Sequence, residues 1–283
     1  MNSMRSSCMK LIACFVFVIL TMGINAQVEK VENAISKTPF VIGETVKIFS
    51  KALDEERILN IYLPNGYDAT SDKKYPVIYL LDGSTDEDFI HVAGLVQFGS
   101  FSWVNMIPET IVVGIANVDR KRDFTYPSNN ERDQTQFPTT GGAEKFIDFI
   151  QNELFQLVEF EYQVTKEKTI IGQSLGGLLA TEILFKKPQL FDHYIIVSPS
   201  LWWDDGSLLT KNFDMTLAPK SIYLAVGKEG EVMERVAQEL HLKLRKLALP
   251  STTLFYKFLE GQDHGDALHI AVYDAFEKMF RKK

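Results

Sequence analysis

Cysteine is almost absent from this chain. Its 283 residues include only Cys8 and Cys14, and both lie in an N-terminal segment that we interpret below as a cleaved leader. Residues 27–283 therefore offer no disulfide, no thiolate nucleophile and no cysteine-ligated metal site. A domain of about 250 residues buries enough apolar surface to fold without such crosslinks.

Histidine and basic clusters are also scarce. The five histidines are scattered and form no His-Glu-x-x-His pair, so we expect no metal and no other cofactor. The formal charge is −7, and the one dense basic run is the terminal Arg281-Lys282-Lys283, which is typical of a solvated helix end. An acidic chain without a basic patch is a poor partner for nucleic acid, and we expect none.

Only one apolar run is longer than a strand. Residues 11–22 follow Arg5 and Lys10 and precede Gly23-Ile24-Asn25-Ala26, which is the pattern of a secretory signal peptide. A membrane anchor is the alternative, but a spanning helix needs about 20 apolar residues. We therefore predict a signal peptide at 1–26 and a single domain at 27–283. The expected location is the periplasm or the medium, without stable membrane insertion after cleavage.

The rest of the chain alternates between two patterns. Apolar runs of strand length recur at 75–81, 110–116, 168–172, 193–198, 221–226 and 253–259. Helical patterns lie between or after them at 86–98, 143–158, 175–187, 231–247 and 267–280. Two alternating strands, 44–50 and 57–63, precede them as an expected edge hairpin around the acidic turn 54–56. Without a linker or repeat, this order predicts an α/β domain whose mostly parallel sheet has helices on both faces and ligands at the carboxyl ends of its strands.

The motif G-x-S-x-G occurs at 172–176, between a predicted strand and a predicted helix. This is the nucleophile elbow of the α/β-hydrolase fold, in which a strained turn exposes the serine and glycines leave room for the packed strand and helix. The motif indicates that Ser174 is the nucleophile of a serine hydrolase. A glycine-rich turn with an incidental serine is the alternative interpretation.

A nucleophilic serine needs a base, which an acid in turn orients. In α/β-hydrolases these follow in the order serine, acid, histidine. His264 lies between the last strand and the last helix, where the base is expected, whereas His269 falls inside that helix. Glu229 follows the strand 221–226 and is our predicted acid. The competing carboxylates are Glu231, Asp204 and Asp205.

An oxyanion hole requires two backbone N–H groups near the nucleophile. One is expected from Leu175, directly after the serine, and the other from the loop after the strand 75–81. Gly83 is the predicted second donor, because glycine permits a close approach of the backbone.

Three segments carry a resemblance to a known family. They are Tyr79-Leu80-Leu81-Asp82-Gly83, the stretch 113–125 and Ile171-Gly172-Gln173-Ser174-Leu175-Gly176-Gly177. Together they resemble the Putative esterase (esterase D-like) family of the α/β-hydrolase superfamily, over roughly residues 46–280. The resemblance implies Ser174 as nucleophile and His264 as base. It leaves the acid open, because some siderophore esterases of this family work with a serine–histidine dyad.

A fourth segment, Val197-Ser198-Pro199-Ser200-Leu201-Trp202-Trp203, looks like a stretch of the enterobactin and bacillibactin esterases. The predicted signal peptide and the order of Ser174, Glu229 and His264 predict an exported serine esterase that acts through an acyl-enzyme. The resemblance implies a siderophore trilactone as one substrate class. The alternatives are a polysaccharide-directed feruloyl or acetyl esterase and a non-catalytic binding protein. The expected partner is thus a small-molecule or oligosaccharide ester.

Three side chains are candidates for substrate binding. Trp202 and Trp203 either stack on an aromatic acyl group or pack beneath the site. Arg122, like Arg120, either meets an anionic substrate or pairs with neighbouring aspartates to brace its loop.

Overall fold

The structure is a computed structural model that describes residues 36–211, 218–247 and 250–281. The chain from Ile42 onward forms one compact unit, and the described residues 36–41 belong to a separate N-terminal unit. The predicted signal peptide, residues 1–26, lies outside the described residues. Within the described ranges, no helix is both long and apolar enough to cross a bilayer.

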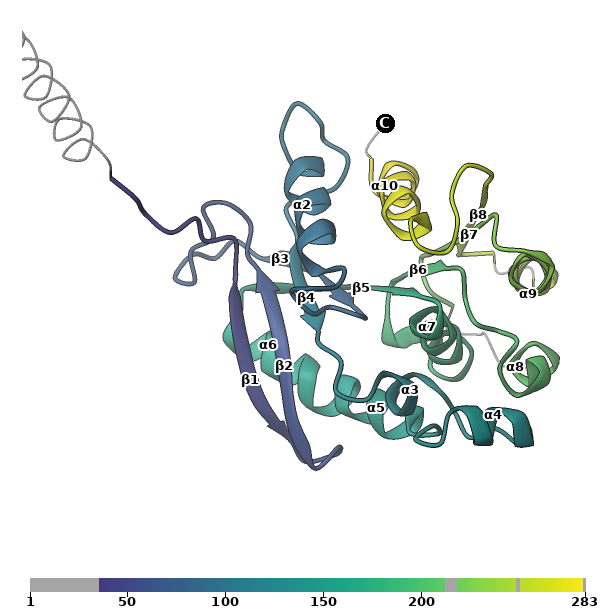
Figure 1. Ribbon diagram of the computed structural model, residues 1–283. Coiled ribbons are helices and arrows are strands. Elements are labelled where there is room, and N and C mark those ends of the chain that lie inside the picture. The colour runs from purple at the N-terminus through teal and green to yellow at the C-terminus, as the bar shows by residue number, and fades with distance from the viewer. Residues whose placement is uncertain (1–35, 212–217, 248–249, 282–283) are drawn as a thin grey trace, which may run out of the picture. The chain divides into compact units, whose positions relative to one another are not determined.

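An eight-stranded sheet forms the centre of the unit from Ile42 onward, with the strand order β1-β2-β4-β3-β5-β6-β7-β8 (Figure 1). Strand β2 is antiparallel to both of its neighbours, and the remaining strand pairs are parallel. The strands are β1 (Glu44–Ser50), β2 (Glu55–Tyr62), β3 (Tyr75–Leu80), β4 (Ile111–Ile115), β5 (Val164–Gln173), β6 (His193–Val197), β7 (Ser221–Gly227) and β8 (Thr253–Leu259). The mostly parallel sheet and the β1–β2 edge hairpin are confirmed.

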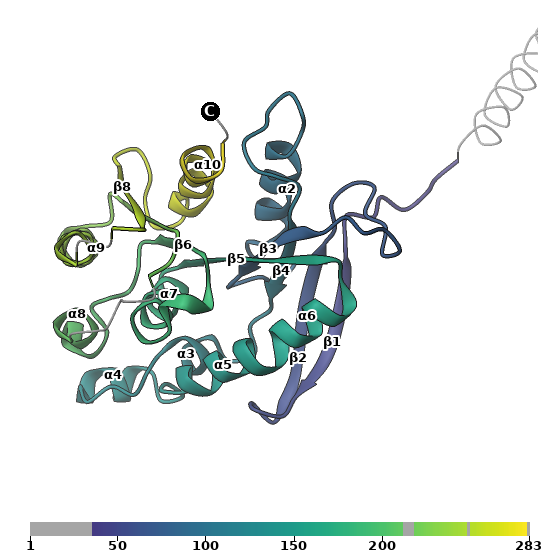
Figure 2. The same cartoon turned by 180° about the vertical axis from the view of Figure 1, so that it is seen from behind.

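Helices cover both faces of the sheet, as predicted (Figure 2). One face packs against α2 (Phe89–Gly99) and α10 (Ala267–Met279). The core of the other face includes side chains of α3 (Arg120–Phe124), α5 (Ala143–Phe149), α6 (Phe155–Glu161), α7 (Leu175–Lys186), α8 (Ser207–Thr210) and α9 (Glu231–Lys246). The short helix α4 (Glu131–Gln136) follows α3 along the chain.

Strand β3 shows why the strands read as continuous apolar runs. Ile78 and Leu80 enter the core with α2 and α10, whereas Val77 and Tyr79 enter the opposite core. All four side chains are at most 1% exposed. A strand that is buried on both faces needs apolar residues at every position, so it lacks the alternation of apolar and polar residues that marks a half-buried strand.

Three details differ from the sequence prediction. The hairpin turn covers residues 51–54, and Glu55 and Glu56 belong to β2, where the carboxylate of Glu55 pairs with Arg57 at 2.8 Å. The helix predicted at 143–158 consists of α5, a π-helical turn (Ile150–Leu154) and α6. The short helices α3, α4 and α8 were not predicted.

Strands β5, β6, β7 and β8 run parallel, so their carboxyl ends meet at one edge of the sheet. The residues that follow these ends include Ser174 after β5, Ser198 after β6 and Lys228 after β7. His264 lies in the segment between β8 and α10. The fold therefore gathers the chemically interesting loops on this edge.

Candidate active site

Ser174 lies between β5 and α7 in a backbone conformation that few non-glycine residues adopt. Its φ and ψ angles are 58° and −120°. The turn is tight: a Cβ added to Gly172 would lie 2.4 Å from the carbonyl oxygen of Gly176. Packing thus requires glycine at position 172, whereas a Cβ at Gly176 would lie 3.3 Å from Asp82 Oδ2. The strained serine has the conformation expected of a nucleophile elbow.

His264 and Glu229 form a hydrogen-bonded pair at the same edge of the sheet. The distance from His264 Nδ1 to Glu229 Oε2 is 2.5 Å. The other carboxylate oxygen, Glu229 Oε1, is fixed by two donors. It accepts hydrogen bonds from the Ser198 hydroxyl and, at 2.9 Å, from the backbone N–H of Gly227. The side chain of Glu229 is 2% exposed and that of His264 is 47% exposed. A buried, fixed carboxylate therefore faces an accessible imidazole.

This pairing shifts both pKa values in the direction that favours an ion pair. Burial alone would raise the pKa of Glu229, but the hydrogen bonds from His264, Ser198 and Gly227 outweigh burial and lower it. The hydrogen bond to Glu229 raises the pKa of His264 above its ordinary value, and partial burial opposes that rise without cancelling it.

Ser174 and His264 line one open pocket of about 630 Å³. The Oγ of Ser174 lies 3.3 Å from the Oγ of Ser200, and no hydrogen bond joins it to His264 within the part of the chain that the structure describes. Ser200 is itself tied to the elbow, because its backbone N–H donates to the Ser174 carbonyl oxygen at 3.0 Å. The pocket is also lined by Trp202, Lys228, Met233 and Asp263.

The competing carboxylates lie elsewhere. Asp204 is buried among its own donors, the backbone N–H of Asn129 at 2.7 Å and the Ser207 hydroxyl at 2.6 Å. Asp205 accepts from the Asn130 side chain at 2.8 Å. Glu231 is exposed in the first turn of α9, where a negative charge complements the helix dipole. Of the four candidate acids, Glu229 alone contacts His264.

The two expected oxyanion donors have different surroundings. Leu175 is the first residue of α7, where N–H groups have no acceptor inside the helix. The N–H of Gly83 instead donates to the carbonyl oxygen of Ile115 at 3.0 Å. The expectation for Gly83 is therefore corrected: its N–H extends the sheet ladder, and it is glycine because a Cβ there would lie 2.4 Å from the Gly114 backbone.

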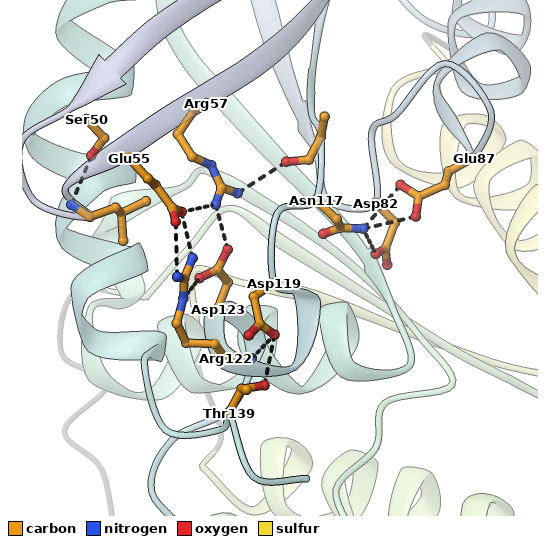
Figure 3. A network of polar contacts seen from close by, with 12 residues as sticks. Ser50, Glu55, Arg57, Asp82, Glu87, Asn117, Asp119, Arg122, Asp123 and Thr139 are labelled. Atoms are coloured by element: carbon orange, nitrogen blue, oxygen red, sulfur yellow. Dashed lines mark hydrogen bonds and ion pairs between the residues drawn. The ribbon is translucent and has the colours of Figure 1, made fainter.

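Asp82 and Arg120 form a second support of the site that sequence reasoning missed. Arg120 binds Asp82 through two bonds of 2.6 Å and 2.9 Å, and it also donates to the carbonyl oxygen of Gln173 at 3.4 Å. Asn117 adds a bond of 2.7 Å to the same carboxylate, as Figure 3 shows. Asp82 has a positive φ of 56°. These contacts connect the β3–α2 loop to the residue before the nucleophile. Their sequence signal was the Asp82-Gly83 pair after a buried strand.

Arg122 does not line the pocket. Its guanidinium binds both carboxylate oxygens of Glu55, at 2.6 Å and 3.0 Å, and Asp123 at 2.8 Å (Figure 3). These hydrogen bonds raise its pKa further above the usual arginine value. The substrate-binding prediction for Arg122 is corrected to the bracing role, with Glu55 as an additional partner.

The two tryptophans differ as well. Trp202 is half-buried and lines the pocket. Trp203 is 1% exposed, and its indole N–H donates to the carbonyl oxygen of Tyr126 at 2.8 Å. A side chain this buried does not reach a substrate, so the substrate-binding prediction for Trp203 is corrected to a packing role.

Comparisons with known proteins show the family of this chain. The model of the family described as "Putative esterase" matches residues 50–265. This chain belongs to that family. The esterase is 29% identical over 262 residues to the ferri-bacillibactin esterase BesA of Bacillus subtilis, an alignment that covers 85% of this chain and 91% of the relative.

Solved structures show the same fold. An IroE-like serine hydrolase from Shewanella oneidensis is 31% identical, with a TM-score of 0.74 and coverage of 84% of this chain and 80% of the other. The BES protein from Bacillus cereus is 28% identical, with a TM-score of 0.76 and coverage of 87% and 98%. The expected α/β-hydrolase fold is confirmed, and the protein is a carboxylic-ester hydrolase of the siderophore-esterase-like serine hydrolases.

Proposed function

We propose that this esterase is exported and opens ester bonds of a siderophore trilactone through a Ser174–His264–Glu229 triad. The observation that carries the proposal is the shared pocket: Ser174, His264 and Glu229 all line it, and the carboxylate of Glu229 lies 2.5 Å from His264 Nδ1. Nucleophile, base and orienting acid are the three parts that acyl transfer needs.

The pairing sets the tautomer of the base. A proton on Nδ1 satisfies Glu229 and leaves Nε2 as the basic nitrogen. Nε2 takes the Ser174 proton as Oγ attacks the ester carbonyl carbon, and the carbonyl electron pair moves onto oxygen. The resulting oxyanion accepts from the Leu175 N–H, which has no acceptor within α7.

Collapse of the tetrahedral intermediate gives an acyl-enzyme. The C–O bond to the alcohol breaks, and the leaving oxygen takes the proton that His264 Nε2 holds. Water then attacks the acyl carbon with His264 as base, and Ser174 recovers its proton as the acid product leaves. Each step uses protein groups and water alone.

Two observations support a siderophore ester as the substrate: the name of a relative and the residues that line the pocket. A relative from Bacillus subtilis is named a ferri-bacillibactin esterase. In the pocket, Trp202 and Met233 offer apolar surface, and Lys228 offers a cation for an anionic substrate. These features suit a large ester with polar aromatic groups.

A panel of esters tests the substrate class. The parent and Ser174→Ala receive a catecholate trilactone with and without iron, a feruloyl sugar and an acetylated oligosaccharide, and kcat/KM is measured for each. We expect the trilactone to be preferred by at least about 100-fold, and Ser174→Ala to be inactive on every ester. A preference for the feruloyl or acetyl substrate would overturn the trilactone proposal while leaving the triad intact.

Export is tested separately. The full chain is expressed in a bacterial host, and the N-terminus of the mature protein is sequenced after fractionation. We expect Gln27 as the first residue, in the periplasm or the medium, because residues 23–26 form the cleavage site. An uncleaved cytoplasmic protein would contradict export.

A further inference from the structure

A second cavity lies next to the proposed catalytic pocket. Its volume is about 530 Å³, and Trp202 lines both cavities. Helix α9 lines both as well, with Met233 at the catalytic pocket and Val236 at the second cavity. Positions three apart share a helix face and lie about 4.5 Å apart along the axis. The two cavities are therefore neighbours that share Trp202 in their walls.

The shared Trp202 is held firmly. Trp203 packs edge-on against Trp202 with ring centroids 6.2 Å apart, and Phe137 contacts Trp202 at 6.4 Å. The φ angles of Asp204 and Asp205 are both positive, at 50° and 52° respectively. Asp204 is buried and accepts three hydrogen bonds, from Ser128, Asn129 and Ser207, which keep this strained turn in place.

The lining has an apolar base and a polar rim. Trp202, Leu209 and Val236 supply the apolar surface. At the rim, Asp205 offers acceptors and Arg235 offers donors, and the guanidinium of Arg235 lies 2.8 Å from Glu239 Oε1. Helices α8 and α9, which carry most of these residues, lie side by side in both views (Figure 1, Figure 2). A flat group with hydroxyl or amide substituents fits such a lining, because its faces pack on the base while its edge bonds the rim.

We propose that the second cavity binds a second, aromatic arm of the same substrate whose scissile ester lies at Ser174. This inference rests on the proposed esterase function and deepens it. Trp202 then contacts two arms of one multi-armed ester, each in its own cavity. The enzyme selects for substrates with a second arm, because a one-armed ester leaves the cavity unfilled.

A matched pair of substrates tests the inference. One is an ester of two N-(2,3-dihydroxybenzoyl)serine units, and the other is the methyl ester of a single unit. Thr210→Trp places an indole in the second cavity, and Arg235→Gln removes the rim cation. The matched controls are Gln238→Trp and Arg245→Gln, two exposed positions of α9 that do not line the cavity.

The measured quantity is the ratio of kcat/KM for the two-unit ester to kcat/KM for the one-unit ester. We expect Thr210→Trp to lower this ratio about tenfold or more, Arg235→Gln to lower it several-fold, and both controls to keep the parent ratio. Ratios within twofold of the parent in both variants would overturn the inference while the esterase function stands. Circular dichroism checks folding, and Arg235→Gln decides the outcome if Thr210→Trp does not fold.

Binding separates this inference from the proposed function. Dissociation constants for both esters are measured in a Ser174→Ala background, where no turnover is required. Tighter binding of the two-unit ester, lost on adding Thr210→Trp and kept on adding Gln238→Trp, supports the second cavity even if the parent hydrolyses neither ester. Equal binding of both esters would overturn it.

Discussion

Replacing Glu229 by glutamine tests the acid of the proposed triad through a hydrogen-bond conflict. Glu229 Oε1 accepts from the Gly227 backbone N–H at 2.9 Å, and that donor cannot reverse. The glutamine oxygen must therefore stay on that side, which turns its NH₂ group toward His264 Nδ1. The imidazole then accepts at Nδ1 and carries its proton on Nε2, the nitrogen that has to act as base.

The expected loss is large. A base held in the wrong tautomer costs about 10⁴ in kcat, or about 5 kcal/mol of transition-state stabilisation. The pH profile changes as well. The base works when neutral, so the raised pKa of His264 places the acid limb of kcat/KM in the parent above about 6.5. Loss of the carboxylate moves that limb to lower pH.

The assay measures kcat/KM for a short p-nitrophenyl ester from about pH 5 to about pH 9, a range that includes the titration of histidine. Glu231→Gln is the matched control, since Glu231 is an exposed neighbour on α9. Thermal melting verifies folding in both variants. Activity of Glu229→Gln within tenfold of the parent, with an unmoved acid limb, would refute the acid role and favour a serine–histidine dyad.

Four further variants test packing and support. Trp203→Ala removes a buried indole and should cost about 3–5 kcal/mol in urea unfolding. Trp202→Ala removes a half-buried indole that lines the pocket, so it should cost less stability than Trp203→Ala and should raise KM. Arg120→Lys cannot reproduce the two-bond contact with Asp82 and should lower kcat more than ten-fold at unchanged melting temperature, and an unchanged kcat would contradict its support role. Gly114→Ala places a Cβ 2.6 Å from Phe89 and should cost about 1–3 kcal/mol in the same unfolding assay.

Much of the fold is predictable from the sequence because buried strands and amphipathic helices leave long, regular patterns. Strand β3 around Ile78 is an example of the first pattern, and α9, which buries Val236, Leu240 and Leu244 on one face, is an example of the second. The hairpin turn is harder to locate. Two glutamates read as turn residues, yet Glu55 lies in β2, since Arg57 and Arg122 neutralise its charge there. Such pairing depends on residues far apart in the sequence.

In the candidate site, too, features that depend on local sequence patterns were predictable, and features that depend on contacts between distant residues were not. Ser174, His264 and Glu229 follow from chain order and strand ends, which are local features. Gly83 does not serve as an oxyanion donor, because its N–H donates to the carbonyl oxygen of Ile115. That bond depends on the register between β3 and β4, which the sequence does not reveal. Trp203 was ambiguous for a similar reason: burial of one of two adjacent tryptophans depends on Tyr126, which is distant in sequence.

The central claim, that Ser174 is the nucleophile, is tested most directly by covalent labelling. The mature chain is treated with a fluorophosphonate, digested, and analysed by mass spectrometry. We predict one label per chain, on the peptide that contains Ser174, with no label in Ser174→Ala and much slower labelling in His264→Ala. Equal labelling of the parent and Ser174→Ala, or a label on Ser200 in place of Ser174, would contradict the account.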